Sequence, residues 1–189
     1  MKIKATMGIV VMLFGSLMGH SQNGWQQKVK DELPLMGHRN WIVIVDSAYP
    51  LQSSSGVETV ETGADQLAVL DYVLGAINDS KHVRPLVHTD TELKFVPEQE
   101  APGVERYREA LKARFKALPA DSIPHVKLIE RLNETGKDFH VLVLKTSMTI
   151  PYTSVFLQLD CRYWGAEAEA RLQAAIKAAE LHGTGSKKP

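Results

Sequence analysis

The sequence contains a single cysteine and has no excess of charge of either sign. Because Cys161 stands alone among 189 residues, the chain cannot form an internal disulfide, a CxxC redox pair or a cysteine-rich zinc site. Lysine and arginine together number 22, as do aspartate and glutamate, and no basic stripe is interleaved with aromatic residues. We therefore expect no nucleic-acid partner. Stability must come from packing, or from packing combined with assembly.

The sequence also lacks the short motifs that mark common phosphate-binding, hydrolytic and zinc-dependent sites. It has no Walker loop, no GxGxxG, no GxSxG and no HExxH. Its seven histidines are scattered without the spacing that metal ligands show. The sequence therefore predicts no metal site and no cofactor.

Charge and polarity change abruptly within the first 22 residues. Lys2 and Lys4 come first, an apolar run from Ala5 to Gly19 follows, and residues 20–22 are small or polar. This order is typical of a cleavable secretory signal, so we expect a signal peptide over residues 1–22 and a periplasmic or secreted protein. The run is shorter than the about 20 apolar residues that cross a membrane, so no stable membrane anchor is expected. A buried N-terminal helix is the alternative interpretation.

The remaining 167 residues suffice for one ordinary domain. Apolar runs predict strands at 41–45, 83–88, 141–144 and 155–159, with Pro85 confining the second to an edge or an irregular path. Helical patterns predict helices at 25–36, 67–77, 104–115 and 166–181, and a short one capped by Asp121 or Ser122. This alternation predicts an α/β fold: a single domain over residues 23–164 with a largely parallel sheet flanked by helices, then an extra C-terminal helix and tail over residues 165–189.

Parallel sheets bind ligands at the carboxyl ends of their strands, which makes Asp46 the first candidate site residue. Asp46 directly follows the apolar run at 41–45, where a carboxylate can accept hydrogen bonds from ligand hydroxyls. His38 lies in the loop before that run. The alternatives are a turn or cap residue for Asp46 and a solvated loop histidine for His38. Eight extended residues span roughly 26 Å, so both can serve one site only if the loop folds back, or if they serve sites in different subunits.

The second candidate segment begins where another apolar run ends, at Lys145. Tyr152 and Ser154 are two residues apart, so in extended chain a phenol and a hydroxyl would point to the same face. The alternative is an ordinary pair on a solvated sheet face. A third group, at residues 88–90, reads His-Thr-Asp and is predicted to be a loop.

These two segments resemble the ribose pyranase and fucose mutarotase (RbsD/FucU-like) family. Its first signature is Gly-His, an apolar strand, then Asp and Pro, which Gly37, His38, Asp46 and Pro50 match; its second is matched by Lys145, Pro151 and Tyr152. The resemblance spans roughly residues 30–160. It implies a cofactor-free enzyme that acts on a monosaccharide such as ribose or fucose. It also implies a homo-oligomer, often a decameric ring, with sites between subunits.

The resemblance assigns His38, Asp46 and Tyr152 as the catalytic residues. Lys145, Ser154 and Glu130 become substrate-binding candidates. A family histidine upstream of the tyrosine falls on Glu130 without a gap and on His125 with one. The family's Asn two residues after the Tyr is Ser154 here, which offers fewer hydrogen bonds, and its Gly-Glu pair is Ser147-Met148.

Opening a cyclic hemiacetal requires one proton to leave the anomeric hydroxyl and another to reach the ring oxygen. His38 is expected to be the general acid and base, Asp46 a hydroxyl anchor or partner of the His, and Tyr152 a second proton-bearing group. Three functions remain open at this point. They are a monosaccharide mutarotase or pyranase, a sugar-binding protein of the same fold that has lost turnover, and a multimeric structural module.

Overall fold

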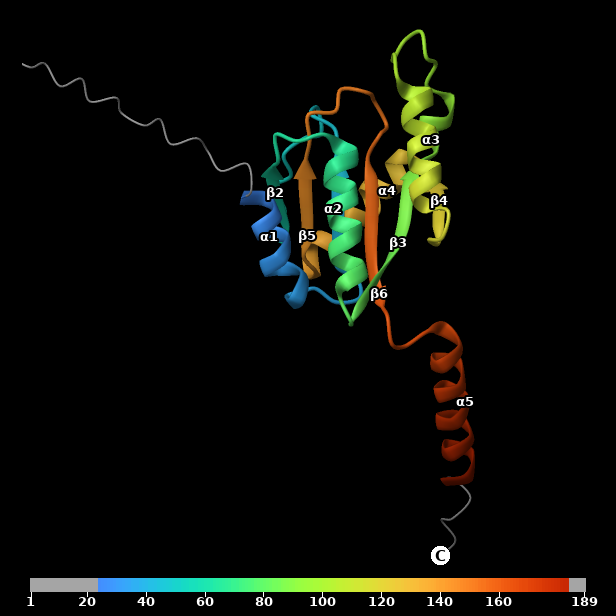
Figure 1. Ribbon diagram of the computed structural model, residues 1–189. Helices are drawn as coiled ribbons and strands as arrows, with labels where there is room; N and C mark the ends of the chain where they lie inside the picture. Colours follow the sequence, from blue (N-terminus) through green and yellow to red (C-terminus); the bar gives the residue numbers. More distant parts are fainter. Residues whose placement is uncertain (1–23, 184–189) are drawn as a thin grey trace, which may run out of the picture.

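The computed structural model describes residues 24–183, and its core is a six-stranded sheet between two layers of helices (Figure 1). The expected signal peptide over residues 1–22 therefore lies outside the described residues, as does the end of the tail. Within 24–183, no helix is long and apolar enough to cross a membrane.

The sheet is mostly parallel, as the sequence predicts. Its order is β2-β5-β1-β6-β3-β4, and β6 alone runs against its neighbours β1 and β3. The carboxyl ends of the other five strands therefore lie along one border of the sheet, together with the amino end of β6. We call this border the carboxyl edge of the sheet. The strands are β1 (Trp41–Val45), β2 (Val57–Glu61), β3 (Val83–Asp90), β4 (Ala120–Ile123), β5 (Val141–Lys145) and β6 (Val155–Cys161).

Helices cover the sheet on both faces. The helices are α1 (Gly24–Glu32), α2 (Gln66–Asp79), α3 (Val104–Phe115), α4 (His125–Asp138) and α5 (Ala166–Gly183), with short 3-10 turns η1 (Leu33–Leu35) and η2 (Thr91–Phe95). Ile42 and Ile44 pack with α1, α2 and α3, whereas Trp41, Val43 and Val45 pack with α4. All five residues of β1 are buried, which explains why its sequence is apolar without alternation.

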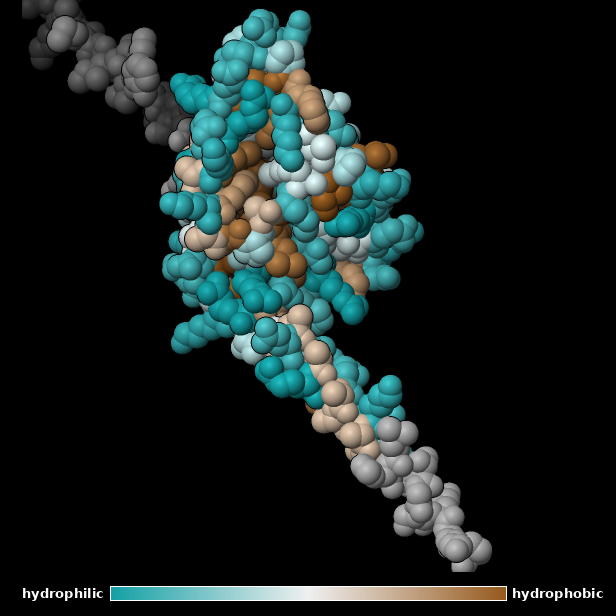
Figure 2. Space-filling view, turned by 90° about the vertical axis from the view of Figure 1, so that its right-hand side faces the viewer, coloured by the Kyte–Doolittle hydropathy of each residue, from teal (hydrophilic) through white to brown (hydrophobic). Residues whose placement is uncertain are grey.

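The extra C-terminal helix is also present, but it stands off the domain. Figures 1 and 2 show α5 leaving the body, with a stripe of weakly hydrophobic side chains along the face that Figure 2 presents. Leu172 and Ile176 on this helix are each 43% exposed. The helix begins with acidic Glu167 and Glu169, which favour a helix start.

The structure corrects two local predictions and adds one strand that was not predicted. Asp121 and Ser122 do not cap a helix; they belong to the short strand β4, and α4 begins after Pro124. Residues 88–90 are not a loop but the end of β3. Strand β2 has no counterpart in the predicted elements. Pro85 is accommodated because β4 pairs only with residues 87–90 of β3, so the proline lies where β3 is locally an edge.

The start of β2 lies directly against the end of α4, and a glycine makes this contact possible. A Cβ at Gly56 would lie 2.7 Å from the carbonyl oxygen of Phe139 and closer still to that of Gly136.

We expect Gly56→Ala to lower the free energy of unfolding by about 1–3 kcal/mol, because the backbone that the new Cβ would meet cannot move aside easily. Gly75→Ala is the matched control: it lies exposed in α2 with nothing near its Cβ position, and should raise stability by about 0.5–1 kcal/mol. Urea unfolding measures both, and equal effects of the two changes would contradict the close approach.

Candidate functional site

A pocket of about 500 Å³ lies at the carboxyl edge of the sheet, where three segments far apart in the sequence meet. The loop after β1 supplies one wall, the first residue of α4 the second, and the turn between β5 and β6 the third. Its lining consists of residues 46–50, His125, Thr149, Pro151 and Tyr152. The volume falls within the about 300–1,000 Å³ of small-molecule sites.

Asp46 opens the first wall, as the sequence predicts. One carboxylate oxygen accepts the N–H of Ala48 at 2.8 Å, so Asp46 shapes its own turn while remaining partly exposed to the pocket. Tyr49 follows and is 5% exposed, with a hydroxyl that has no hydrogen-bond partner among the described residues. Burial, together with the nearby carboxylates of Asp90 and Asp46, raises the pKa of Tyr49 to about 12. The phenol therefore stays protonated at neutral pH and can donate a hydrogen bond.

The second wall is a buried carboxylate paired with a histidine. His125 Nδ1 lies 3.0 Å from a carboxylate oxygen of Asp90, whose side chain is fully buried, and the other Asp90 oxygen has no partner among the described residues. Glu92 accepts the backbone N–H of His125 through both oxygens, at 3.1 and 3.0 Å. The ring is thus fixed at the start of α4. Because Asp90 occupies Nδ1, any proton exchange with a ligand falls to Nε2.

The third wall is a turn that carries Tyr152. The Tyr152 ring meets the His125 ring edge to face, with centroids 5.6 Å apart and an interplanar angle of 82°. Tyr152 has a φ of 58°, in the left-handed region, so it is not in the extended conformation that the spacing to Ser154 predicted. Ser154 is buried at the start of β6 and does not line the pocket.

A buried polar cluster holds this turn in place. Gln66, fully buried at the start of α2, donates to the Tyr107 hydroxyl at 2.8 Å and to the carbonyl oxygen of Thr153. Tyr107 donates to the same carbonyl at 2.7 Å, and its pKa is raised by burial. Thr146 donates to the carbonyl of Val45 at 2.8 Å. These contacts join the turn to β1 and α2, so the position of Tyr152 is set by groups that the pocket does not expose.

The remaining candidates lie in different places. Lys145 ends β5 and donates to the carbonyl of Tyr49 at 3.0 Å, so it supports the first wall from behind. Glu130 forms an ion pair with Lys127 at 2.8 Å and lines a separate hollow between α4 and the amino end of β1. His38 lies exposed in the loop before β1, at the opposite end of that strand from Asp46. One copy of the chain therefore brings Asp46 and Tyr152 together with His125, but not with His38 or Glu130.

Sequence reasoning missed Asp90 and Tyr49 and left His125 as one of two alternatives. Asp90 could have been identified from its position, because it follows the strand predicted at 83–88 by two residues. Among the described residues, one group of three side chains is close enough to hold a metal ion. It consists of Glu32, Glu58 and His140, and it lies away from this pocket, near the amino end of β5.

Comparison with known proteins assigns the chain to a family. The model of the RbsD / FucU transport protein family matches residues 25–161, and the chain belongs to this family. No curated protein matches. Bacillus subtilis RbsD, solved with D-ribose, has a TM-score of 0.51 at 16% identity over 79% of this chain and 98% of that one. FucU from Bifidobacterium longum has a TM-score of 0.50 at 19% identity over 70% and 92%.

These likenesses establish the fold, and the family membership confirms the resemblance seen in the sequence. Helix α5 follows the segment that the family model matches, so it is an addition to the shared fold.

Burial makes Asp90 a pH-dependent source of instability. It raises the pKa of Asp90 from an ordinary 3.8 to about 6, against the opposing effect of His125, and Glu92 and Asp46 add to the rise. The folded state therefore favours the protonated form of Asp90, and the stability that this form contributes is lost as the pH rises through about 6.

We expect the free energy of unfolding of Asp90→Asn to rise relative to that of the parent chain by on the order of 2 kcal/mol when the pH is raised from 4 to 7. Urea unfolding across this pH range measures the difference; a pH-independent difference would contradict the burial argument.

Proposed function

We propose that this protein is a cofactor-free monosaccharide mutarotase or pyranase, which interconverts the anomers or ring forms of a sugar. The observation that carries the proposal is the pairing of His125 with buried Asp90 opposite Asp46 and Tyr152 around one pocket. Family membership supports the same reaction class. The structure of Bacillus subtilis RbsD with D-ribose supports a monosaccharide as the ligand.

The reaction needs one group that takes a proton and another that gives one. With Nδ1 held by Asp90, Nε2 of His125 accepts the proton of the anomeric hydroxyl, and the partly exposed Tyr152 hydroxyl donates to the ring oxygen. Asp46 accepts a hydrogen bond from a neighbouring sugar hydroxyl. The ring opens, the carbonyl carbon rotates, and the protons return on closure, so every atom is conserved and no metal or cofactor takes part.

The resemblance in the sequence assigns this proton transfer to His38. We propose that His38 takes part as well, and that a second copy of the chain contributes it. His38 of one subunit reaches the pocket of a neighbour and shares the transfer with His125. This arrangement requires a homo-oligomer with the amino end of β1 of one copy against the carboxyl edge of another. We further propose that the signal peptide predicted over residues 1–22 directs this activity to the periplasm or outside the cell.

The activity is tested by exchange NMR, which reports both sugar binding and the interconversion of anomers. With ribose, fucose, galactose and glucose as substrates, we expect one sugar class to show accelerated exchange. His125→Ala should slow the catalysed exchange about 100-fold. Tyr152→Phe keeps the ring contact with His125 but removes the donor, and should cost about tenfold. Tyr163→Phe is the control, since Tyr163 is 77% exposed and outside the pocket.

Binding without acceleration for every sugar would contradict the enzymatic proposal and leave a sugar-binding protein. The sequence features that favour this second function are the departures from the family pattern at Ser154 and Met148 and the uncertain place of the family histidine. An absence of binding would contradict both.

The shared site is tested by complementation between two inactive chains. When His38→Ala and His125→Ala chains are co-expressed, about a quarter of the pockets in a mixed oligomer combine an intact His38 with an intact His125. We expect exchange activity to return to about this fraction of the parent value. Sedimentation of the mixed protein checks that oligomers form. No recovery in mixed oligomers, or full activity of the His38→Ala chain alone, would show that His38 does not act in a neighbour's pocket.

A further inference from the structure

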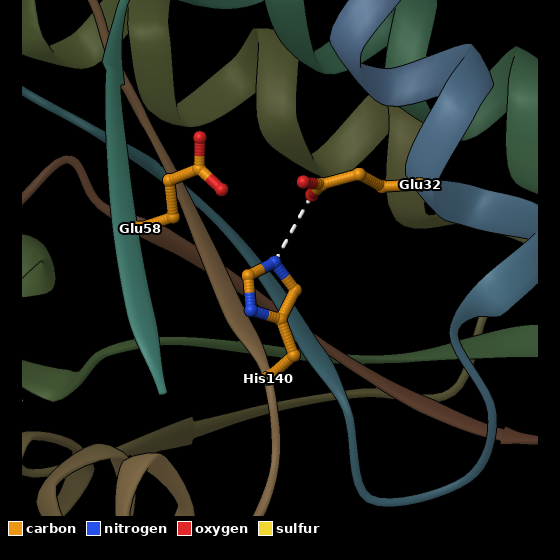
Figure 3. Close-up of side chains that lie close together, drawn as sticks. All are labelled: Glu32, Glu58 and His140. Atoms are coloured by element: carbon orange, nitrogen blue, oxygen red, sulfur yellow. Dashed lines mark hydrogen bonds and ion pairs between the residues drawn. The ribbon is translucent and has the colours of Figure 1, made fainter. Parts of the chain in front are cut away.

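A second cluster of chemically active side chains lies near the amino end of β5, at the opposite end of the parallel strands from the pocket. Glu32 comes from the end of α1, Glu58 from the edge strand β2, and His140 immediately precedes β5 (Figure 3). One oxygen of each carboxylate and one imidazole nitrogen lie within 4.8 Å of one another, and His140 Nε2 is 3.0 Å from Glu32. The proposed sugar chemistry uses none of these residues.

The cluster already surrounds a positive charge. The Lys28 ammonium lies 2.6 Å from one oxygen of Glu32 and 2.6 Å from one oxygen of Glu58, so both carboxylates converge on a cation. Burial pushes the pKa of Glu32 up, but the bonds from Lys28 and His140 outweigh it and the net shift is downward. Two ionised carboxylates, one ammonium and one neutral imidazole together carry a net charge of −1, which favours a cation among them.

We propose that Glu32, Glu58 and His140 bind a divalent first-row transition metal, with zinc as the test ion, at the position that the Lys28 ammonium occupies. Zinc accepts Glu oxygen and His nitrogen at about 2.0–2.2 Å, so the carboxylates need close by only about half an ångström from their distances to Lys28. The imidazole selects against calcium and magnesium, which prefer oxygen ligands alone.

Displacing Lys28 is feasible because its side chain is 32% exposed and can turn into solvent. A divalent ion in its place neutralises the two carboxylates fully and gains His140 as a third ligand. Glu32 is 16% exposed and His140 34%, so the ion is partly shielded from water. Bound metal would join α1 to β2, which is paired with only one other strand.

The test is calorimetric titration of Zn²⁺ into the full chain after treatment with a chelator. We expect one ion per chain, with affinity reduced at least about tenfold by Glu58→Gln and by His140→Ala. Lys28→Met removes the competing ammonium and should tighten binding about tenfold. Glu61→Gln is the matched control, because it removes the same charge from the same strand outside the cluster, and should bind as the parent does.

A second readout separates this site from chance binding elsewhere. Zn²⁺ should raise the thermal unfolding midpoint of the parent and of Lys28→Met, but not that of His140→Ala, because only a native site links binding to folding. Circular dichroism checks that each variant folds. The proposal is overturned if no zinc binds, if His140→Ala binds as tightly as the parent, or if Lys28→Met fails to bind more tightly.

Discussion

The insertion of β6 between β1 and β3 is the constraint on which the site depends. β6 pairs with both neighbours in antiparallel register, so its amino end lies beside the carboxyl ends of β1 and β3. The turn that precedes β6 therefore carries Tyr152 into the space between the Asp46 loop and the Asp90–His125 pair. If β6 ran parallel to its neighbours, its amino end would lie at the other edge of the sheet. Three segments that are spread over about a hundred residues of the sequence meet because one strand is reversed.

The carboxyl edge of the sheet also brings several carboxylates together around the buried Asp90. This arrangement lowers the stability of the folded chain, but it places a group that can exchange protons beside the pocket. Asp90 is buried with one oxygen lacking a partner among the described residues, while Asp46 and Glu92 add negative charge nearby. His125 pairs with Asp90, and the Lys145 ammonium supports the loop that carries Asp46 by donating to the carbonyl of Tyr49. Burial and the neighbouring carboxylates raise the pKa of Asp90 to about 6, so Asp90 can exchange a proton near neutral pH.

Much of the fold follows from the sequence, because its strong elements are buried on both faces. β1 is predicted residue for residue, since five consecutive apolar residues fit only a doubly covered strand. β2 is missed because Val-Glu-Thr-Val-Glu neither alternates nor runs apolar, as suits a half-exposed edge. The reversal of β6 is also invisible, because apolarity carries no direction. For the site, Asp46 and Tyr152 are found from motifs. His125 and Asp90 need the pairing of β3 with β4, which sets them side by side across 35 residues.

The structure removes one way in which His38 and Asp46 could share a site. The sequence leaves open that the intervening chain folds back, but residues 41–45 are hydrogen-bonded to β5 on one side and to β6 on the other, and are buried on both faces. Folding back would break both ladders and expose five apolar side chains. At about 3.3 Å per residue, β1 alone separates the two ends by roughly 17 Å. A site that uses both residues therefore has to combine two copies of the chain, whereas a site within one copy has to rely on His125.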